Sequence, residues 1–205
     1  MFVTTLLSFI LIHSAIYTLG KIDSTDNKKI PKEIYTSIKK YLGPKGTILV
    51  PAYFYNYSRK NEPFDIYKSP PDKSLGIFSK YFFENRNFYR SKNPITSLAG
   101  TGYFAKKICK KSNAKPYGPG SAWEILTNLN THIVFLGTSL SNSLTYIHYI
   151  EFLAKVPHMY LKKFTIPIKS YGKKIEDKSY GYVRYLNCNV EVNLNKFQKD
   201  LESKK

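Results

Sequence analysis

A glycine-bearing turn and a histidine-bearing segment, about 25 residues apart, point to group-transfer chemistry. The turn reads Tyr117-Gly118-Pro119-Gly120-Ser121 and is followed by an expected helix, a strand and then the segment Thr145 to Glu151. Backbone amides of such a turn can hold a carbonyl or phosphate oxygen, and a helix start adds partial positive charge. His148 and Glu151 lie three residues apart, so on a helix they share a face, with a base and a carboxylate to orient it.

Length and composition indicate one globular domain over residues 1–205. Hydrophobic residues make up 42% of the chain and aromatic residues 16%, which supports a sizeable core and argues against wholesale disorder. The two cysteines, Cys109 and Cys188, have neither disulfide-framework nor zinc-ligand spacing. We therefore expect free thiols, no metal and a cytoplasmic location.

The apolar stretch from Phe2 to Leu19 resembles a signal or membrane segment only superficially. No Lys or Arg precedes it, and several Thr and Ser residues interrupt it. We expect instead a buried strand over 6–12 that turns at His13-Ser14 into a helix start, and hence no membrane partner.

The chain is strongly basic, with 32 Lys plus Arg against 14 Asp plus Glu and a formal net charge of +18. This balance would ordinarily suggest a nucleic-acid partner. However, only four of the cations are arginine, whereas proteins that read bases and phosphates rely on arginine forks. We expect no specific nucleic acid, although an anionic cofactor would benefit from the positive field.

Periodicity and turn signals predict an alternating order of helices and strands, which indicates an α/β fold. A capping box of Ser121 and Glu124 predicts the start of a helix over 121–129. Further helices are expected over 32–41, 75–84, 144–153 and 195–203. Strands are expected over 47–55 and, buried, over 131–136, with a strand-turn-helix unit over 97–110 and a C-terminal strand pair. Polar loops are expected over 56–74 and 137–142.

Five segments resemble, in the same order, the aminoglycoside 3-N-acetyltransferase family over about residues 8–165. They are 10–20, 42–51, 90–102, 117–121, and Leu136-Gly137 followed by 145–151. Ala15, Asn93, Ala122 and Leu144 depart from the residues usual in the family, and both ends of the chain look short. The order of the five segments makes the resemblance specific.

The resemblance implies a three-layer α/β/α fold with a mixed central sheet flanked by helices. It also implies acetyl-coenzyme A as donor, a primary amine of an aminoglycoside or amino sugar as acceptor, and direct transfer in a ternary complex with His148 as general base. No metal is implied. The resemblance also implies two sets of cofactor-binding residues. The first set forms the first turn and consists of His13, Ser14, Ala15 and Ile16. The second set borders the reaction centre and consists of Arg90, Ser91, Tyr117, Gly118, Gly120 and Ser121.

Several alternatives stay open at this point. Glu151 is the first choice for the carboxylate that orients His148, and Glu176 or Asp177 are the alternatives. His132 and His158 are expected at the surface. Aminoglycosides are polycations that need an acidic cleft, so the basic chain gives equal weight to a sugar with one amine, free or carried on a nucleotide diphosphate. Another acyl donor such as a formyl carrier, an inactive cofactor-binding scaffold and a homodimer are also open.

Overall fold

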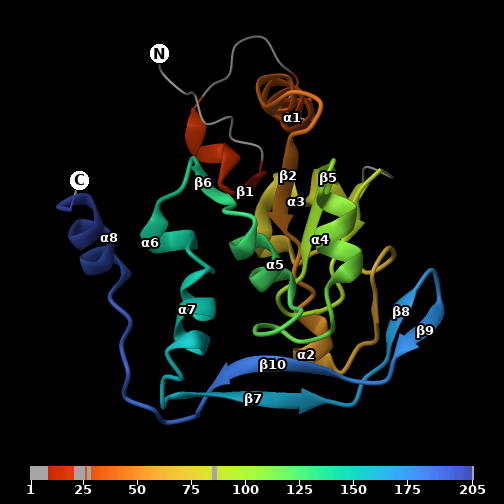
Figure 1. Ribbon diagram of the computed structural model, residues 1–205, viewed down its shortest axis with the longest axis vertical. Helices are drawn as coiled ribbons and strands as arrows, with labels where there is room; N and C mark the ends of the chain where they lie inside the picture. Colours follow the sequence, from red (N-terminus) through yellow and green to blue (C-terminus); the bar gives the residue numbers. More distant parts are fainter. Residues whose placement is uncertain (1–8, 21–25, 27–28, 85–86, 205) are drawn as a thin grey trace.

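A five-stranded mixed sheet forms the centre of the computed structural model, which describes residues 9–20, 26, 29–84 and 87–204 (Figure 1). The strand order is β4-β5-β2-β1-β6. Strand β1, next to the edge strand β6, pairs in parallel with β2 and β6, whereas the central strand β2 pairs antiparallel with β5, and β5 with β4. The bounds are β1 Phe9–Ser14, β2 Thr47–Pro51, β4 Tyr89–Arg90, β5 Leu98–Gly102 and β6 His132–Leu136.

Helices cover both faces of this sheet and complete the expected three layers. Side chains of a strand alternate between faces, so Ile10 and Ile12 of β1 pack with α1 (Ile30–Leu42) and α3 (Gly76–Glu84) on one side. Leu11 points to the other side, toward α4 (Ala105–Lys111) and α5 (Ala122–Asn128). The mixed α/β prediction is confirmed.

Local signals account for the helix boundaries. A proline lies in the first turn of α1, and Gly43 ends the helix with a φ of 71°. At the start of α5, Ser121 Oγ accepts a hydrogen bond from the Glu124 amide at 3.2 Å, and Glu124 Oε2 accepts one from the Gly120 amide at 2.7 Å. This is the predicted capping box, with the carboxylate bound one residue earlier than usual.

Other sequence-based boundaries need correction. The first strand is β1, and residues 6–8 of the predicted 6–12 lie outside the described residues. The strand over 131–136 is not buried, because β6 is the edge of the sheet and its residues are exposed or half-buried. The loop over 137–142 includes part of a short helix, α6 (Leu140–Ser143), and the helix after it, α7 (Ile147–Leu153), starts later than predicted. The loop over 56–74 holds α2 (Asn56–Lys60), β3 (Phe64–Asp65) and part of a 3-10 turn (Lys73–Leu75).

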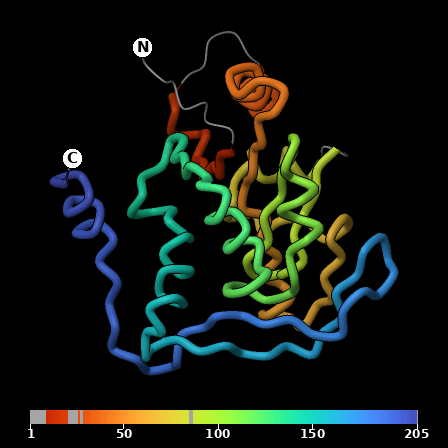
Figure 2. Tube along the Cα trace, in the orientation of Figure 1, coloured from red at the N-terminus to blue at the C-terminus, as the bar shows by residue number. Residues whose placement is uncertain are grey.

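The C-terminal third forms a long ribbon beneath the layers. Strands β7 (Met159–Phe164) and β10 (Ser179–Arg184) pair antiparallel along six residues, and the hairpin of β8 (Ile168–Ser170) and β9 (Lys173–Glu176) adds to β3. Figure 2 shows this ribbon running from the end of α7 across to the small sheet, with α8 (Leu194–Glu202) beyond it beside α6. The predicted C-terminal strand pair and helix are therefore present.

Two sequence-based expectations on composition can also be compared with the structure. Both cysteines are free. Among the residues described, no helix has the length and apolar character needed to cross a membrane.

Candidate active site

The histidine and glutamate singled out in the sequence meet on α7. His148 Nδ1 lies 2.7 Å from Glu151 Oε2, and the two residues occupy one helical face because they are three positions apart. The histidine side chain is 44% exposed, whereas the glutamate side chain is 10% exposed. A buried carboxylate thus holds a ring that remains accessible to solvent.

This contact fixes the tautomer of the ring. An ionised carboxylate can only accept hydrogen bonds, so the neutral His148 ring carries its proton on Nδ1. The lone pair of Nε2 is then available to take a proton from a bound molecule. That is the arrangement a general base requires.

A second histidine lies on the other side of the same carboxylate. His158 Nε2 is 3.5 Å from Glu151 Oε1, an ion-pair distance rather than a hydrogen bond, and its side chain is 13% exposed. The prediction of a surface residue is wrong for His158, because the chain folds back beside α7 at the start of β7, whereas His132 is exposed as predicted. The Tyr182 hydroxyl donates to the Glu151 carbonyl at 3.3 Å, so β10 also contacts this part of α7.

The alternative orienting acids lie elsewhere. Asp177 Oδ1 is 2.7 Å from Lys174 Nζ, and Glu176 Oε1 is 4.0 Å from Lys92 Nζ. Both acids belong to the β8–β9 region rather than to α7. Glu151 is therefore the carboxylate that orients the His148 ring.

His13 lies at the carboxyl end of β1, on the bend predicted to hold a cofactor. Its side chain is buried, stacks on Phe135 with ring centroids 5.7 Å apart, and has Nε2 3.4 Å from Thr145 Oγ1. Burial lowers the pKa of His13 to about 4, so the ring is neutral at physiological pH. Through Thr145 the ring links the bend to the segment that carries His148.

The bend itself opens on a cavity of about 610 Å³. Ser14, Ala15 and Ile16 line it together with Thr138, Ser143 and residues from the 3-10 turn and the start of α3. The Ala15 amide already donates to the Leu136 carbonyl at 2.9 Å, and the Thr138 and Ser143 hydroxyls lie 2.8 Å apart in a hydrogen bond to each other. Side-chain hydroxyls and the Lys73 ammonium are among the polar groups that face the cavity. Of the described residues that line the cavity, none is on α7, and His148 is not brought into it.

Gly137 allows the loop after β6 to close against this bend. Its φ is 68°, and a Cβ there would lie 2.6 Å from both the Ala15 carbonyl oxygen and Thr18 Oγ1. Any larger residue would push the loop away from the bend, in addition to the strain of a left-handed backbone. Close packing of the loop after β6 against the bend thus explains the glycine in the Leu136-Gly137 motif.

Arg90 and Ser91, predicted to border the cofactor, form hydrogen bonds to backbone groups. The buried Arg90 guanidinium donates to the carbonyls of Ala52 and Ser69 and, through Nε, to Ser97 Oγ at 3.3 Å. Ser91 Oγ accepts from the Leu98 amide at 2.9 Å. Neither residue lines the bend cavity. The sequence could not show that carbonyls from two other segments and the Ser97 hydroxyl converge on this arginine. Its place at the border of the cofactor stays a prediction.

The turn from Tyr117 to Ser121 also makes many contacts within the protein. Tyr117 is buried among aromatic rings of α5, α7 and β10, with the Tyr149 centroid at 5.9 Å. A Cβ on Gly118 would lie 3.0 Å from the Phe152 ring, so this glycine permits close packing on α7. Because Gly120 donates to Glu124 and Ser121 caps α5, these groups are not offered to a cofactor or an oxyanion.

The sequence therefore located the His148–Glu151 pair and the bend, but not the buried partner His158 or the link through Thr145. An i, i+3 pair on one helix is a local signal, whereas the other contacts depend on tertiary packing. The part of the chain that the structure describes holds no group of three or more His, Cys, Asp or Glu side chains suited to a metal ion.

Comparison with known proteins identifies the fold and the family. The sequence profile described as aminoglycoside 3-N-acetyltransferase matches residues 11–205. This chain belongs to that family. The family assignment covers nearly the whole chain, including β1, α7 and the C-terminal ribbon.

Three relatives illustrate how distant the family members are. Aminoglycoside N(3)-acetyltransferase IV of a Salmonella species is 26% identical over 149 residues, which cover 73% of this chain and 54% of the relative. The structure of AAC-IIIb with coenzyme A has a TM-score of 0.75 at 20% identity and covers 96% of this chain and 79% of that one. A mutant of AAC(3)-IVa in complex with a gentamicin has a TM-score of 0.68 at 23% identity, covering 94% and 70%. This aminoglycoside 3-N-acetyltransferase-family chain thus spans about half the length of the curated relative.

Proposed function

We propose that this chain is an acetyl-coenzyme A-dependent N-acetyltransferase that acylates a primary amine of an aminoglycoside or amino sugar. The observation that carries the proposal is the 2.7 Å contact between the half-exposed His148 ring and the buried Glu151 carboxylate. The family membership and the relatives with bound coenzyme A or gentamicin support the same reaction class.

The bend cavity suits the extended arm of the donor. Its volume of about 610 Å³ falls within the range of small-molecule sites, and the hydroxyls of Ser14, Thr138 and Ser143 can hydrogen bond amide and phosphate oxygens. Lys73, on its rim, provides a positive charge for a phosphate. Acetyl-coenzyme A, when bound, supplies the acyl group as an activated thioester.

The chain's own residues then have defined roles. An amine is protonated near neutral pH and cannot attack until it loses a proton. His148 Nε2 takes that proton, and the Glu151 carboxylate stabilises the imidazolium that forms while it keeps the ring in position. His13 stays neutral and shapes the bend, so we assign it a positioning role rather than proton transfer.

The test is a thiol-release assay with acetyl-coenzyme A and a panel of amines that includes gentamicin and a hexose with one amino group. His148→Ala should lower the rate by about 100-fold or more, because general-base catalysis contributes at least that factor. His132→Ala is the matched control, since His132 is an exposed histidine on an edge strand and should retain full rate. Circular dichroism and thermal unfolding check that both variants are folded.

Two outcomes would contradict the proposal. His148→Ala could retain the wild-type rate, or the wild-type chain could bind coenzyme A without turnover on any amine, which would make it a cofactor-binding scaffold.

The panel of amines also decides between a polycationic acceptor and one with a single amine. Net charge of +18 favours a substrate with one amine over a polycation, so we expect the higher kcat/KM on the hexosamine.

A further inference from the structure

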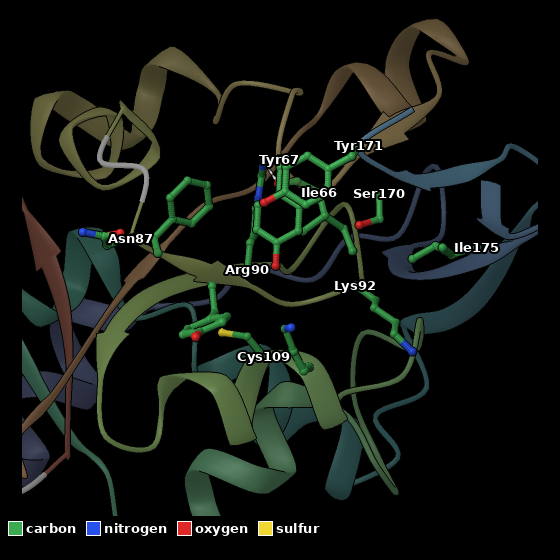
Figure 3. A pocket seen from close by; sticks show the side chains of 12 residues that line it. Ile66, Tyr67, Asn87, Arg90, Lys92, Cys109, Ser170, Tyr171 and Ile175 are labelled. Atoms are coloured by element: carbon green, nitrogen blue, oxygen red, sulfur yellow. Dashed lines mark hydrogen bonds between the residues drawn. The ribbon is translucent and has the colours of Figure 1, made fainter. Parts of the chain in front are cut away.

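A second cavity of about 500 Å³ opens between β4, α4 and the β8–β9 hairpin (Figure 3). It shares no lining residue with the bend cavity, and the proposed acyl transfer does not use it. Among the described residues around it, none that lines it is acidic. Its wall is aromatic and cationic, and the residues that matter here are Tyr67, Tyr89, Arg90, Lys92, Lys110 and Tyr171.

One side of the cavity is a stacked pair of tyrosines. The rings of Tyr67 and Tyr171 are 4.4 Å apart between centroids and inclined by 12°. Figure 3 shows both rings on one side of the cavity and Cys109 on the opposite side. Because Tyr171 is 69% exposed, the stack presents open ring surface on which a further planar group can lie.

A single buried carboxylate holds this stack in place. Asp65 accepts hydrogen bonds from the amides of Tyr171 at 3.2 Å and Gly172 at 2.6 Å, and from the amide of Tyr67 at 3.0 Å. Tyr171 has a φ of 50°, a left-handed conformation that tyrosine rarely adopts without such support. The aromatic wall is therefore arranged before any ligand arrives, which lowers the entropy lost on binding.

Three cations give the cavity a positive potential. Lys110 Nζ lies 5.6 Å from the centroid of the Tyr89 ring, and Lys92 Nζ is 4.0 Å from its nearest carboxylate oxygen, on Glu176, which is too long for a hydrogen bond. The buried Arg90 guanidinium hydrogen bonds to neutral oxygens, and the charge of the nearby Asp65 carboxylate helps to keep it protonated. Burial lowers its pKa to about 9, and it remains protonated at neutral pH.

We propose that this cavity binds a planar aromatic ring that carries a phosphate group, such as a nucleoside monophosphate. The ring extends the Tyr67–Tyr171 stack, and the phosphate lies between Lys92 and Lys110, since lysine binds phosphate as a point charge. The volume of about 500 Å³ falls in the range that small-molecule ligands occupy.

The proposal can be tested by isothermal titration calorimetry with uridine monophosphate, uridine and inorganic phosphate. We expect the monophosphate to bind at least about fivefold more tightly than either fragment, because ring stacking and charge both contribute. Lys110→Ala and Tyr171→Ala should each raise its Kd at least about fivefold. Lys107→Ala is a matched control with an expected change below about twofold, because Lys107 is on the same helix, also lies 5.6 Å from a ring centroid, and does not line the cavity.

Tyr171→Ala removes one member of the hairpin stack and can loosen the hairpin, so Lys110→Ala on the other wall serves as the independent variant. Thermal unfolding of each variant separates lost binding from lost structure. Four results would overturn the proposal: no saturable binding, equal affinity for inorganic phosphate, equal losses in Lys107→Ala and Lys110→Ala, or displacement of the nucleotide by pantetheine, which has no nucleotide portion and would place the binding in the bend cavity.

Discussion

Two buried carboxylates in this molecule face different kinds of partner. Counted over the whole residue, Glu151 is 8% exposed and Asp65 is 7% exposed. Glu151 contacts two imidazole rings, of His148 and His158. Asp65 accepts hydrogen bonds from four backbone amides, those of Tyr67, Lys68, Tyr171 and Gly172.

The partners of each carboxylate indicate whether it takes part in proton transfer or only stabilises the fold. A backbone amide cannot change its protonation state, so the partners of Asp65 fix the positions of two chain segments and nothing else. Imidazole takes up and releases protons near physiological pH. A carboxylate that orients an accessible imidazole is suited to proton transfer, while the other carboxylate keeps the small sheet together.

The largest effect is expected for Glu151→Gln. The amide retains the shape of the carboxylate but removes the charge that stabilises a protonated His148, so the rate of acetyl transfer should fall about 100-fold or more. Thermal unfolding should change little by comparison. If Glu151→Gln unfolded the protein and left the rate per folded molecule intact, Glu151 would belong with Asp65 as an architectural residue.

The pH dependence of stability tests the buried ring beside the bend. The pKa of His13 is about 4 in the folded state and 6.5 in the unfolded chain. Because the folded value is lower, the unfolded chain binds the proton first as the pH falls. The free energy of unfolding should therefore drop by about 3 kcal/mol between roughly pH 6.5 and 4.

Urea unfolding at several pH values measures this loss. His13→Asn should flatten that part of the profile, and His132→Asn, at an exposed position, should leave it unchanged. Equal slopes in His13→Asn and the wild type would show that His13 is not the group responsible.

Asp65→Asn should act on stability rather than on catalysis. The substitution replaces one accepting oxygen with an NH2 group that faces another donor, so we expect a loss of about 2 kcal/mol, which corresponds to roughly 4–8 °C in Tm. Acetyl transfer per folded molecule should remain close to that of the wild type. A specific loss of rate at unchanged Tm would contradict the architectural role.

The smallest effect is expected at Ser121, which the sequence placed among the cofactor ligands. Its hydroxyl caps α5, so Ser121→Ala should cost about 1 kcal/mol of stability and leave the Kd for coenzyme A unchanged. Ser14→Ala, in the bend cavity, is the contrasting variant and should weaken coenzyme A binding. Equal weakening of coenzyme A binding in both variants would show that the turn from Tyr117 to Ser121 belongs to the cofactor site.

These contrasts also show what the sequence could and could not predict. The capping box at Ser121 and the His148–Glu151 pair depend on residues three positions apart, and both were found because helices bring such residues together. The use of Arg90 depends on carbonyls contributed by distant segments, and the burial of His158 depends on where β7 returns under α7. No local pattern encodes these contacts, and the predicted place of Arg90 beside the cofactor rests on the family resemblance alone.

The long parallel pairing of β1 with β6 has a consequence for the order of folding. Paired residues of these strands are more than 120 positions apart, whereas Phe164 and Ser179 of the β7–β10 ribbon are separated by 15. Chain closure over the longer span costs more entropy and is slower, so the ribbon can assemble early while β6 reaches the sheet late. His13 meets Phe135 and Thr145 only after that step, so the bend takes its final shape when β6 has joined β1.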